Sequence, residues 1–328
     1  FAERCFKQIE GFGEYGFPES HAASFALLVY ISAWMKHHYP AVFACALLNS
    51  QPMGFYSPSQ LVQDAQRHKV TVLAPDVNHS HREHTLQGPE KHLRLGLRII
   101  RGLSSSGADR IHQHRPKNGY QSAAELRTRA GLNQRDMELL AGANAMPGFT
   151  SNRHQAYWQL LEHEEPAELF ANETMADYQP EPCHLLPEPT EGQNVLADYS
   201  SQGLTLQRHP LALLREQGHL SYCLTADKLK TTRPGIPVQV AGLVTGRQRP
   251  GTASGVTFVT LEDETGIANL FVPRDTFHQY RLVITTEQFL LCHGRMQVGE
   301  GNTCTLYTTA VEPLPFPAAL DTSSHDFH

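Results

Sequence analysis

The hydrophobic pattern divides the chain into a helical part and a strand-rich part. Up to about residue 162, apolar positions fall in short amphipathic blocks that Gly and Pro interrupt, which is typical of short helices. These blocks predict helices over residues 1–15, 20–39, 41–49, 60–68, 93–103, 107–114, 123–130, 133–141 and 152–162, with a short strand over 70–73.

The pattern changes to strands near residue 237. Five strand-like runs cover residues 237–246, 256–262, 267–272, 288–297 and 303–311, and a helical stretch over 274–282 separates the third from the fourth. Three strands, a helix and two strands is the order of an OB-fold barrel. We therefore predict a multidomain α+β chain, helical at first and ending in a five-stranded OB-fold β-barrel.

Composition and turn signals divide the chain further. Between the two parts, residues 163–195 are rich in Glu and Pro and indicate a linker, followed by a helix near 210–217. The short helices after residue 93 follow the rhythm of helix-hairpin-helix units. The predicted segments are 1–92 (helical), 93–162 (helix-hairpin-helix), 163–235 (linker and connecting helix), 236–315 (OB-fold) and 316–328 (tail).

Composition is that of an ordinary globular protein, with 40% apolar and 18% charged residues among 328. The net charge of −6 is unevenly spread, because residues 1–160 carry 17 Lys and Arg against 12 Asp and Glu. A phosphate-contacting surface is therefore expected in the first half.

Six scattered cysteines without a CxxC pair argue against a zinc ribbon or a disulfide framework and favour the reducing cytoplasm. The apolar stretch 22–35 is too short for a bilayer and predicts a buried helix, so no membrane is expected.

Ser20 and His21 stand at the N-terminus of this apolar helix. Free N–H groups and the positive end of the helix dipole suit a phosphate there, and a histidine can donate to a phosphate oxygen. The alternative is that Ser20 only caps the helix and His21 is a surface residue.

A second candidate site follows residue 95, where a small-residue turn lies between two predicted helices. Gly102 and Gly107 would let the backbone approach a DNA phosphate, and Arg98, Arg101 and Arg110 would add non-specific charge. The alternative is a helical hairpin packed for structure alone.

The third candidate site lies in the predicted barrel. Arg247, Arg249, Phe258 and Phe271 combine guanidinium groups with aromatic rings, and OB-folds bind single strands by stacking bases on aromatics and pairing phosphates with Arg. The competing interpretation places both Phe side chains in the core.

Motifs for a self-contained active site are missing. His79, His81 and His84 lie close in sequence but match no common zinc spacing, so a polar loop is the better interpretation and no metal site is predicted. No phosphate-binding loop, nucleophile elbow or Asp-x-Asp pair occurs. No catalytic residue is therefore predicted in this chain.

Three sequence blocks, in order, resemble the bacterial C-family DNA polymerases. The first reads GFGEYGF at 11–17, SHAASFA at 20–26 and WMKHHYPAVF at 34–43, and is similar to their fingers region. Residues 93–103 (LRLGLRIIRGL) are similar to the start of their helix-hairpin-helix region, and 238–311 to their OB domain. Segment 1–92 would then be the helical fingers region.

The error-prone, damage-inducible (ImuC-like) branch fits better than the replicative branch. Pro18 and Glu19 precede Ser20 and His21 where the replicative branch usually has Lys, and LLNSQPMGFY at 47–56 resembles the error-prone branch. The chain also ends soon after the barrel, whereas replicative relatives carry a further domain that binds the clamp loader. Because it opens at Phe1 within an amphipathic run, we expect a C-terminal part of a longer polymerase.

The resemblance implies translesion DNA synthesis on a primer-template. Deoxynucleoside triphosphates would be the substrates, with Ser20 and His21 binding the incoming nucleotide, and two Mg²⁺ would be held by palm aspartates upstream of Phe1. This portion should then be inactive alone. An alternative is a stand-alone, non-enzymatic DNA-binding adaptor, which the reading frame upstream of Phe1 would distinguish.

Residues 166–170 (PAELF) are the nearest match to the clamp-binding pentapeptide of replicative relatives, but the initial Gln is missing. We therefore expect contact with the sliding clamp to be indirect, through accessory translesion proteins that include a Y-family-like partner.

Overall fold

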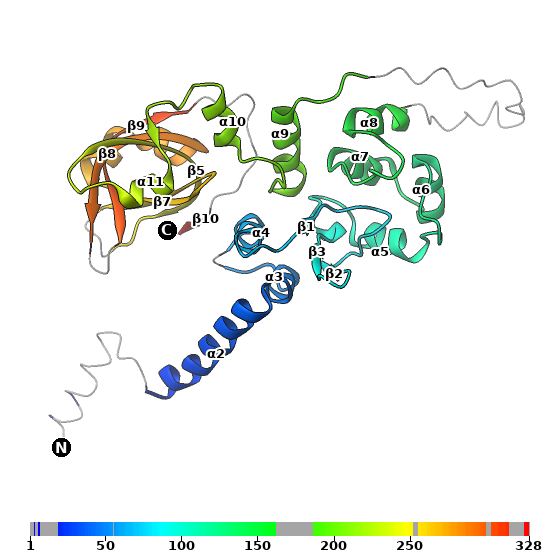
Figure 1. The fold of residues 1–328 in the computed structure, drawn as a ribbon, viewed down its shortest axis with the longest axis horizontal. Coiled ribbons are helices and arrows are strands. Elements are labelled where there is room, and N and C mark those ends of the chain that lie inside the picture. Colours follow the sequence, from blue (N-terminus) through cyan, green and yellow to red (C-terminus); the bar gives the residue numbers. More distant parts are fainter. Residues whose placement is uncertain are drawn as a thin grey trace, which may run out of the picture.

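The computed structural model describes residues 19–54, 56–161, 186–251, 255–299, 303–314 and 325–327, with the isolated helical residues Glu3 and Phe6. The described chain forms a helical part and a β-barrel, and helix α9 lies between them (Figure 1). This confirms the predicted order of a helical region followed by a five-stranded OB-fold barrel.

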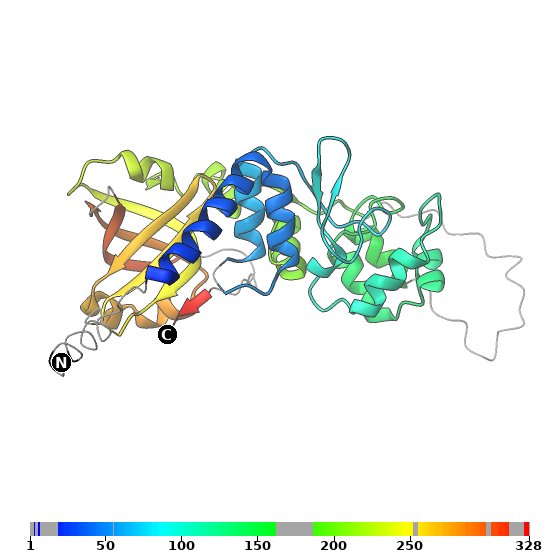
Figure 2. The same cartoon turned by 90° about the horizontal axis from the view of Figure 1, so that it is seen from below.

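Three helices begin the described chain: α2 (Glu19–His38), α3 (Pro40–Asn49) and α4 (Pro58–Arg67). Pro40 ends α2 because it cannot continue the hydrogen-bond ladder, and it starts α3 at a first-turn position. A capping box between Ser57 and Gln60 fixes the start of α4. In Figure 2 α3 and α4 lie between the barrel and the small sheet described below.

The apolar stretch forms the predicted helix, but the prediction that this helix is buried was wrong. Helix α2 packs against α3 near its C-terminal end, where Lys36 pairs with Asp64 of α4 at 2.8 Å, and then extends away from the body of the molecule (Figure 1). Because the stretch is apolar on every side, its pattern does not indicate which side a neighbour covers. Its apolar and aromatic side chains that are 45 to 68% exposed are Phe25, Leu27, Leu28, Val29, Tyr30, Ile31 and Trp34.

A small sheet follows in place of the helix predicted over 93–103, so that prediction was wrong. The strands are β1 (Val72–Leu73), β2 (Thr85–Gln87) and β3 (His92–Arg94), in the order β1-β3-β2, and a 3-10 turn, η1 (Leu97–Ile99), comes next. Leu93, Leu95 and Leu97 are all fully buried at every second position, which is the period of an extended chain. The predicted boundary at 92/93 falls within β3, and one apolar core extends on both sides of it.

Four helices complete the helical part: α5 (Ser105–Gln113), α6 (Ala123–Ala130), α7 (Gln134–Gly142) and α8 (Arg153–Leu161). Side chains of Ser104, Ser122 and Asn133 each accept a bond from a first-turn N–H and so fix the starts of α5, α6 and α7. Gly131, with a φ of 57°, ends α6 in the left-handed region.

Helix α9 (Glu191–Gln202) joins the two parts. On one side, Arg153 of α8 donates to Asp198 at 2.7 Å and Gln202 donates to the carbonyl of Ala143 at 3.1 Å. On the other side, Val195 and Tyr199 are buried against α10 (Pro210–Glu216) and the barrel. The linker predicted over 163–195 therefore overlaps the start of this helix at Glu191.

The barrel consists of β5 (Pro237–Gln248), β6 (Thr257–Asp263), β7 (Gly266–Val272), β8 (Phe289–Val298) and β9 (Cys304–Pro313). Strand β5 pairs with β6 and β8, β6 with β7, β7 with β9 in parallel, and β9 with β8, so the five strands close a ring. Helices α12 (Arg274–Gln279) and α13 (Arg281–Thr286) replace the one helix predicted over 274–282. Around the ring lie β4 (Cys223–Leu224), α11 (Ala226–Thr231) and β10 (His325–Phe327).

His84 is a buried polar anchor of the small sheet. Its Nδ1 accepts a hydrogen bond from the backbone N–H of Gly96 at 3.1 Å, so this nitrogen carries no proton in the folded chain. Burial, and secondarily the charge of Arg98, lower the pKa of His84 to about 4.

We predict that this histidine destabilises the fold in acid. In the unfolded chain His84 takes up a proton as the pH falls below its ordinary pKa of about 6.5, whereas in the folded chain it stays neutral until about pH 4. Between these values the wild type should lose about 3 kcal/mol of unfolding free energy relative to His84→Gln, because one pKa unit is worth about 1.4 kcal/mol. Urea unfolding at several pH values measures this difference. The exposed His114→Gln serves as control, and parallel pH profiles for wild type and His84→Gln would contradict the prediction.

Candidate nucleic-acid interface

An aromatic row crosses the outside of the barrel. Phe258 on β6 lies directly opposite Phe271 on β7, and Phe271 lies directly opposite Tyr307 on β9. The ring centroids are 5.8 Å apart in the first pair, edge to face, and 5.6 Å apart in the second, stacked. We call Phe258, Phe271 and Tyr307 the aromatic ladder.

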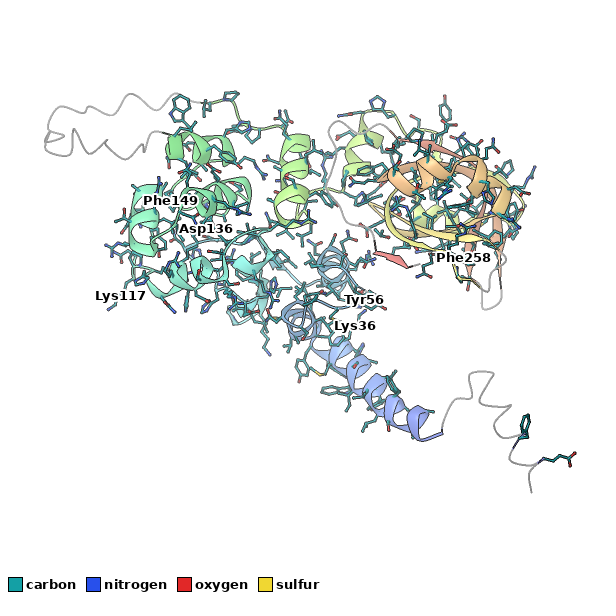
Figure 3. All side chains as sticks on the ribbon, turned by 180° about the vertical axis from the view of Figure 1, so that it is seen from behind. Lys36, Tyr56, Lys117, Asp136, Phe149 and Phe258 are labelled. Atoms are coloured by element: carbon teal, nitrogen blue, oxygen red, sulfur yellow. The ribbon has the colours of Figure 1, made fainter. Side chains whose placement is uncertain are left out.

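The ladder faces outward because strand side chains alternate between the two faces of a sheet. The neighbouring residues Val259, Leu270 and Leu306 are at most 1% exposed and form the barrel core. Phe258 is 39% exposed, while Phe271 and Tyr307 are half-buried by the ring contacts. The two Phe side chains therefore do not fill the core, which was the competing interpretation. Figure 3 shows Phe258 on the barrel, far from Lys117 and Asp136 of the helical part.

Tyr307 was not among the predicted site residues. It joins the ladder because β7 and β9 pair in parallel to close the barrel, which brings together residues far apart in sequence. The only sequence signal was its place in an alternating run, CTLYTTAV, where its two neighbours Leu306 and Thr308 are buried.

Polar side chains continue the row at both ends. Gln248 on β5 lies opposite Phe258, and exposed Arg295 on β8 lies opposite Tyr307. Adjacent strands are about 4.8 Å apart, so the five positions span about 19 Å of the barrel surface. Flat rings with a guanidinium at one end are suited to stacking bases and pairing a phosphate, without reading sequence.

The two barrel arginines that were predicted to bind DNA do not belong to the cross-strand row of the aromatic ladder. Arg247 lies opposite inward-facing Val259, and its guanidinium donates to the carbonyls of Ile284 and Glu287 at 2.6 Å each. Arg249 is exposed, and its guanidinium carbon lies 4.7 Å from the ring centre of Phe277. Arg247 thus holds the end of α13, whereas Arg249 lies at the surface.

Arginines of the helix-hairpin-helix region also bind backbone carbonyls. Arg98 donates to the carbonyls of Asn49 and Gln51 at 3.0 Å each and pairs with Glu83. Arg110 donates to the carbonyls of Ala130 and Gly131 at 2.7 and 3.0 Å, which caps the end of α6. Such contacts support a structural role for both side chains.

Arg101 lies at the junction with α9. Its backbone N–H donates to Ser201 at 2.8 Å, and its side chain borders a cavity of about 270 Å³ between the helical part and the barrel. Arg98 and the buried Glu262 line the same cavity.

The predicted glycines surround the turn that precedes α5. Gly102 has a φ of 81°, which other residues rarely adopt, and it is exposed. Gly107 is buried within α5, where a Cβ would lie 2.8 Å from a carboxylate oxygen of Asp136. Asp136 itself accepts from the backbone N–H and the hydroxyl of Ser104. The turn is therefore held by α7, and Gly107 packs inside rather than facing a ligand.

Arg135 is a further candidate contact that the sequence did not single out. It is exposed, and its Nη2 lies 3.7 Å from where a Cβ on Gly102 would stand. Within the described chain, no hydrogen bond or ion pair engages its guanidinium. It is therefore placed beside the exposed turn, where it can meet a phosphate.

The three histidines of the 79–84 segment turn in different directions. His79 pairs with Asp76 at 2.7 Å, the His81 ring lies tilted against that of His112 with ring centres 3.9 Å apart, and His84 is buried and bonded to Gly96. Among the described residues, no three His, Cys, Asp or Glu side chains are grouped so as to hold a metal ion.

Family comparisons match both parts of the chain. A helix-hairpin-helix motif family matches residues 69–156, and an OB-fold nucleic acid binding domain family matches residues 238–314. Error-prone DNA polymerases from Alkalilimnicola ehrlichii and Pseudomonas paraeruginosa are 48% and 46% identical over 100% of this chain. The enzyme of the same name from Methylococcus capsulatus is 47% identical over 92% of it. By sequence, the chain matches a C-terminal part of the error-prone DNA polymerases.

The chain spans about a third of these relatives, covering 32% of the first two and 30% of the third. Two predictions about the polymerase fall outside what is described. Ser20 and His21 lie in the first turn of α2, but their side chains are not described. The segment 166–170, compared with the clamp-binding pentapeptide, lies outside the described residues. Both stay predictions.

We predict that Arg110→Ala lowers stability. The substitution removes two charge-assisted bonds to the last carbonyls of α6, each worth about 1.5 to 3 kcal/mol, although partial exposure reduces their effect. A loss of about 1 to 3 kcal/mol of unfolding free energy is expected in urea titrations. Arg135→Ala is the matched control and should unfold like the wild type. Equal stability of Arg110→Ala and wild type would contradict the assignment.

Proposed function

We propose that this chain handles the DNA strands of an error-prone polymerase during damage-induced translesion synthesis. The outward aromatic ladder carries the proposal, because it lies on the barrel of a nucleic acid binding family and has no role in the core. Bases stack on rings whatever their identity, so such a surface accepts damaged and undamaged template alike. The match of this whole chain to part of error-prone polymerases favours this function over a stand-alone adaptor.

In the whole polymerase, a primer 3′-hydroxyl would attack the α-phosphate of a deoxynucleoside triphosphate with Mg²⁺ bound elsewhere in the protein. This portion would position template and incoming nucleotide, the latter through Ser20 and His21, and should be inactive alone. The exposed turn at Gly102, with Arg135 beside it, would contact the duplex backbone without reading sequence.

The cytoplasm is the proposed location, where the polymerase would meet DNA and accessory translesion proteins. Those proteins would include a Y-family-like partner and, through it, the sliding clamp. Among the described residues, no helix has the length and apolar character needed to span a bilayer.

We predict that removing one ladder ring weakens single-strand binding. Phe271→Ala should lower the affinity for oligo-dT by about five- to a hundredfold, since stacking contributes about 1 to 3 kcal/mol per base. Fluorescence anisotropy with the full chain measures this, and the affinity should also fall steeply as salt rises. Tyr56→Ala, which removes an exposed aromatic ring of the helical part, is the control. Unchanged affinity of Phe271→Ala at unchanged melting temperature would reject the proposed interface.

A further inference from the structure

The outer face of strands β5 and β8 is covered over only part of its length. Ala241, Leu243 and Phe289 lie beneath α9 and α10 in a small apolar core. Toward the start of β5 this cover ends, and the remaining face is open. It carries Pro237 and Gln239 of β5 beside Arg295 and His293 of β8, which are their direct cross-strand partners.

A groove of about 780 Å³ occupies this open face. Gln239, His293, Arg295 and Thr309 give it a polar surface, while Ile236 and Tyr222 add apolar area. Tyr222 precedes β4, which pairs with β5 through Cys223 and Gln239, so it stands at the edge of the groove. Its side chain is 88% exposed, more than any other large apolar or aromatic side chain among the described residues.

The groove continues the aromatic ladder. Tyr307 lies opposite Arg295, and Arg295 lies opposite Pro237, so one cross-strand row leads from the ladder into the groove. Arg295 stands at the joint, where it donates to the carbonyl of Gly235 at 2.9 Å and remains exposed. Its guanidinium has five N–H donors, so this bond leaves donors for a phosphate.

The chemistry of the groove fits a nucleotide better than an apolar helix. An apolar helix needs a continuous apolar floor, and here the polar side chains of Gln239, His293 and Arg295 interrupt the floor. Nucleotides need a ring to stack on, a cation and hydrogen-bonding groups, which Tyr222, Arg295 and Gln239 offer. Arg233, exposed in the adjoining segment, adds positive charge. At the rim, Glu312 lies 3.2 Å from the Nε2 of His293.

We propose that the groove is a second stacking site for single-stranded nucleic acid, with Tyr222 stacking a base and Arg295 contacting a phosphate between groove and ladder. The proposal rests on the single-strand binding proposed for the ladder. From Phe258 to Arg295 the row covers three strand spacings, about 14 Å, and Tyr222 lies beyond it. A short oligonucleotide therefore occupies the ladder alone, and only a longer one reaches Tyr222.

The test compares two lengths of oligo-dT on the full chain, about four and about twelve nucleotides, within the range of OB-fold site sizes. Tyr222→Ala should lower the affinity for the longer strand by about five- to a hundredfold and leave the shorter strand unaffected. Tyr222→Phe, which keeps the ring, should restore the affinity for the longer strand. Phe271→Ala should weaken both lengths, because both occupy the ladder.

The two variants together distinguish a failure of the groove site from a failure of the single-strand binding proposed for the ladder. Wild-type affinity of Tyr222→Ala for the longer strand, with Phe271→Ala still weakened, would overturn the groove site and leave the ladder standing. Equal weakening of both lengths by Tyr222→Ala would also overturn it, because Tyr222 would then belong to the ladder site. If neither variant affected either length, the proposed single-strand binding would itself be wrong. The Tyr222 variants should melt at the wild-type temperature, since Tyr222 is exposed.

Discussion

Closure of the barrel by parallel pairing of β7 with β9 is the constraint on which the candidate interface depends. This pairing sets Phe271 opposite Tyr307 and, with β6, lines up three rings from three strands. A shift of one residue in register would turn each ring into the core. On the other side of β9, the pairing with β8 requires a glycine at position 294, because a Cβ there would lie 2.2 Å from the carbonyl oxygen of Tyr307. Burial of the inward-facing apolar side chains thus fixes the strand register, and the register places the three aromatic rings on the outside.

Several arginines that were predicted to bind DNA make structural contacts. Arg98, Arg110 and Arg247 were predicted to bind DNA, yet each donates to two backbone carbonyls near the end of a helix. Unpaired carbonyls at helix ends need donors, and a guanidinium supplies several in a fixed plane. Counting arginines near a motif therefore overestimates the binding surface. The better candidates are Arg135 and Arg295, which are exposed beside the turn and the ladder.

The sequence predicted the fold more closely than the site. Helix α6 was predicted to the residue, because Ser122 caps its start and Gly131 ends it, and the barrel strands were found within two residues from their alternation. The helix predicted over 93–103 was wrong, because the leucines there alternate as in an extended chain. Helix α9 was not predicted, because its start lies within the Glu- and Pro-rich segment that indicated a linker. Cross-strand partners such as Tyr307 depend on barrel closure, which no local pattern records.

Single-stranded DNA is proposed to lie along the aromatic ladder on the outside of the barrel. The most direct measurement is an NMR titration of the chain, labelled in its Phe and Tyr rings, with oligo-dT. Ring resonances of Phe258, Phe271 and Tyr307 should move with added DNA, while those of the buried Phe277 and Phe289 should stay in place. Saturable DNA binding that left the resonances of the three ladder rings unchanged would contradict DNA binding along the ladder.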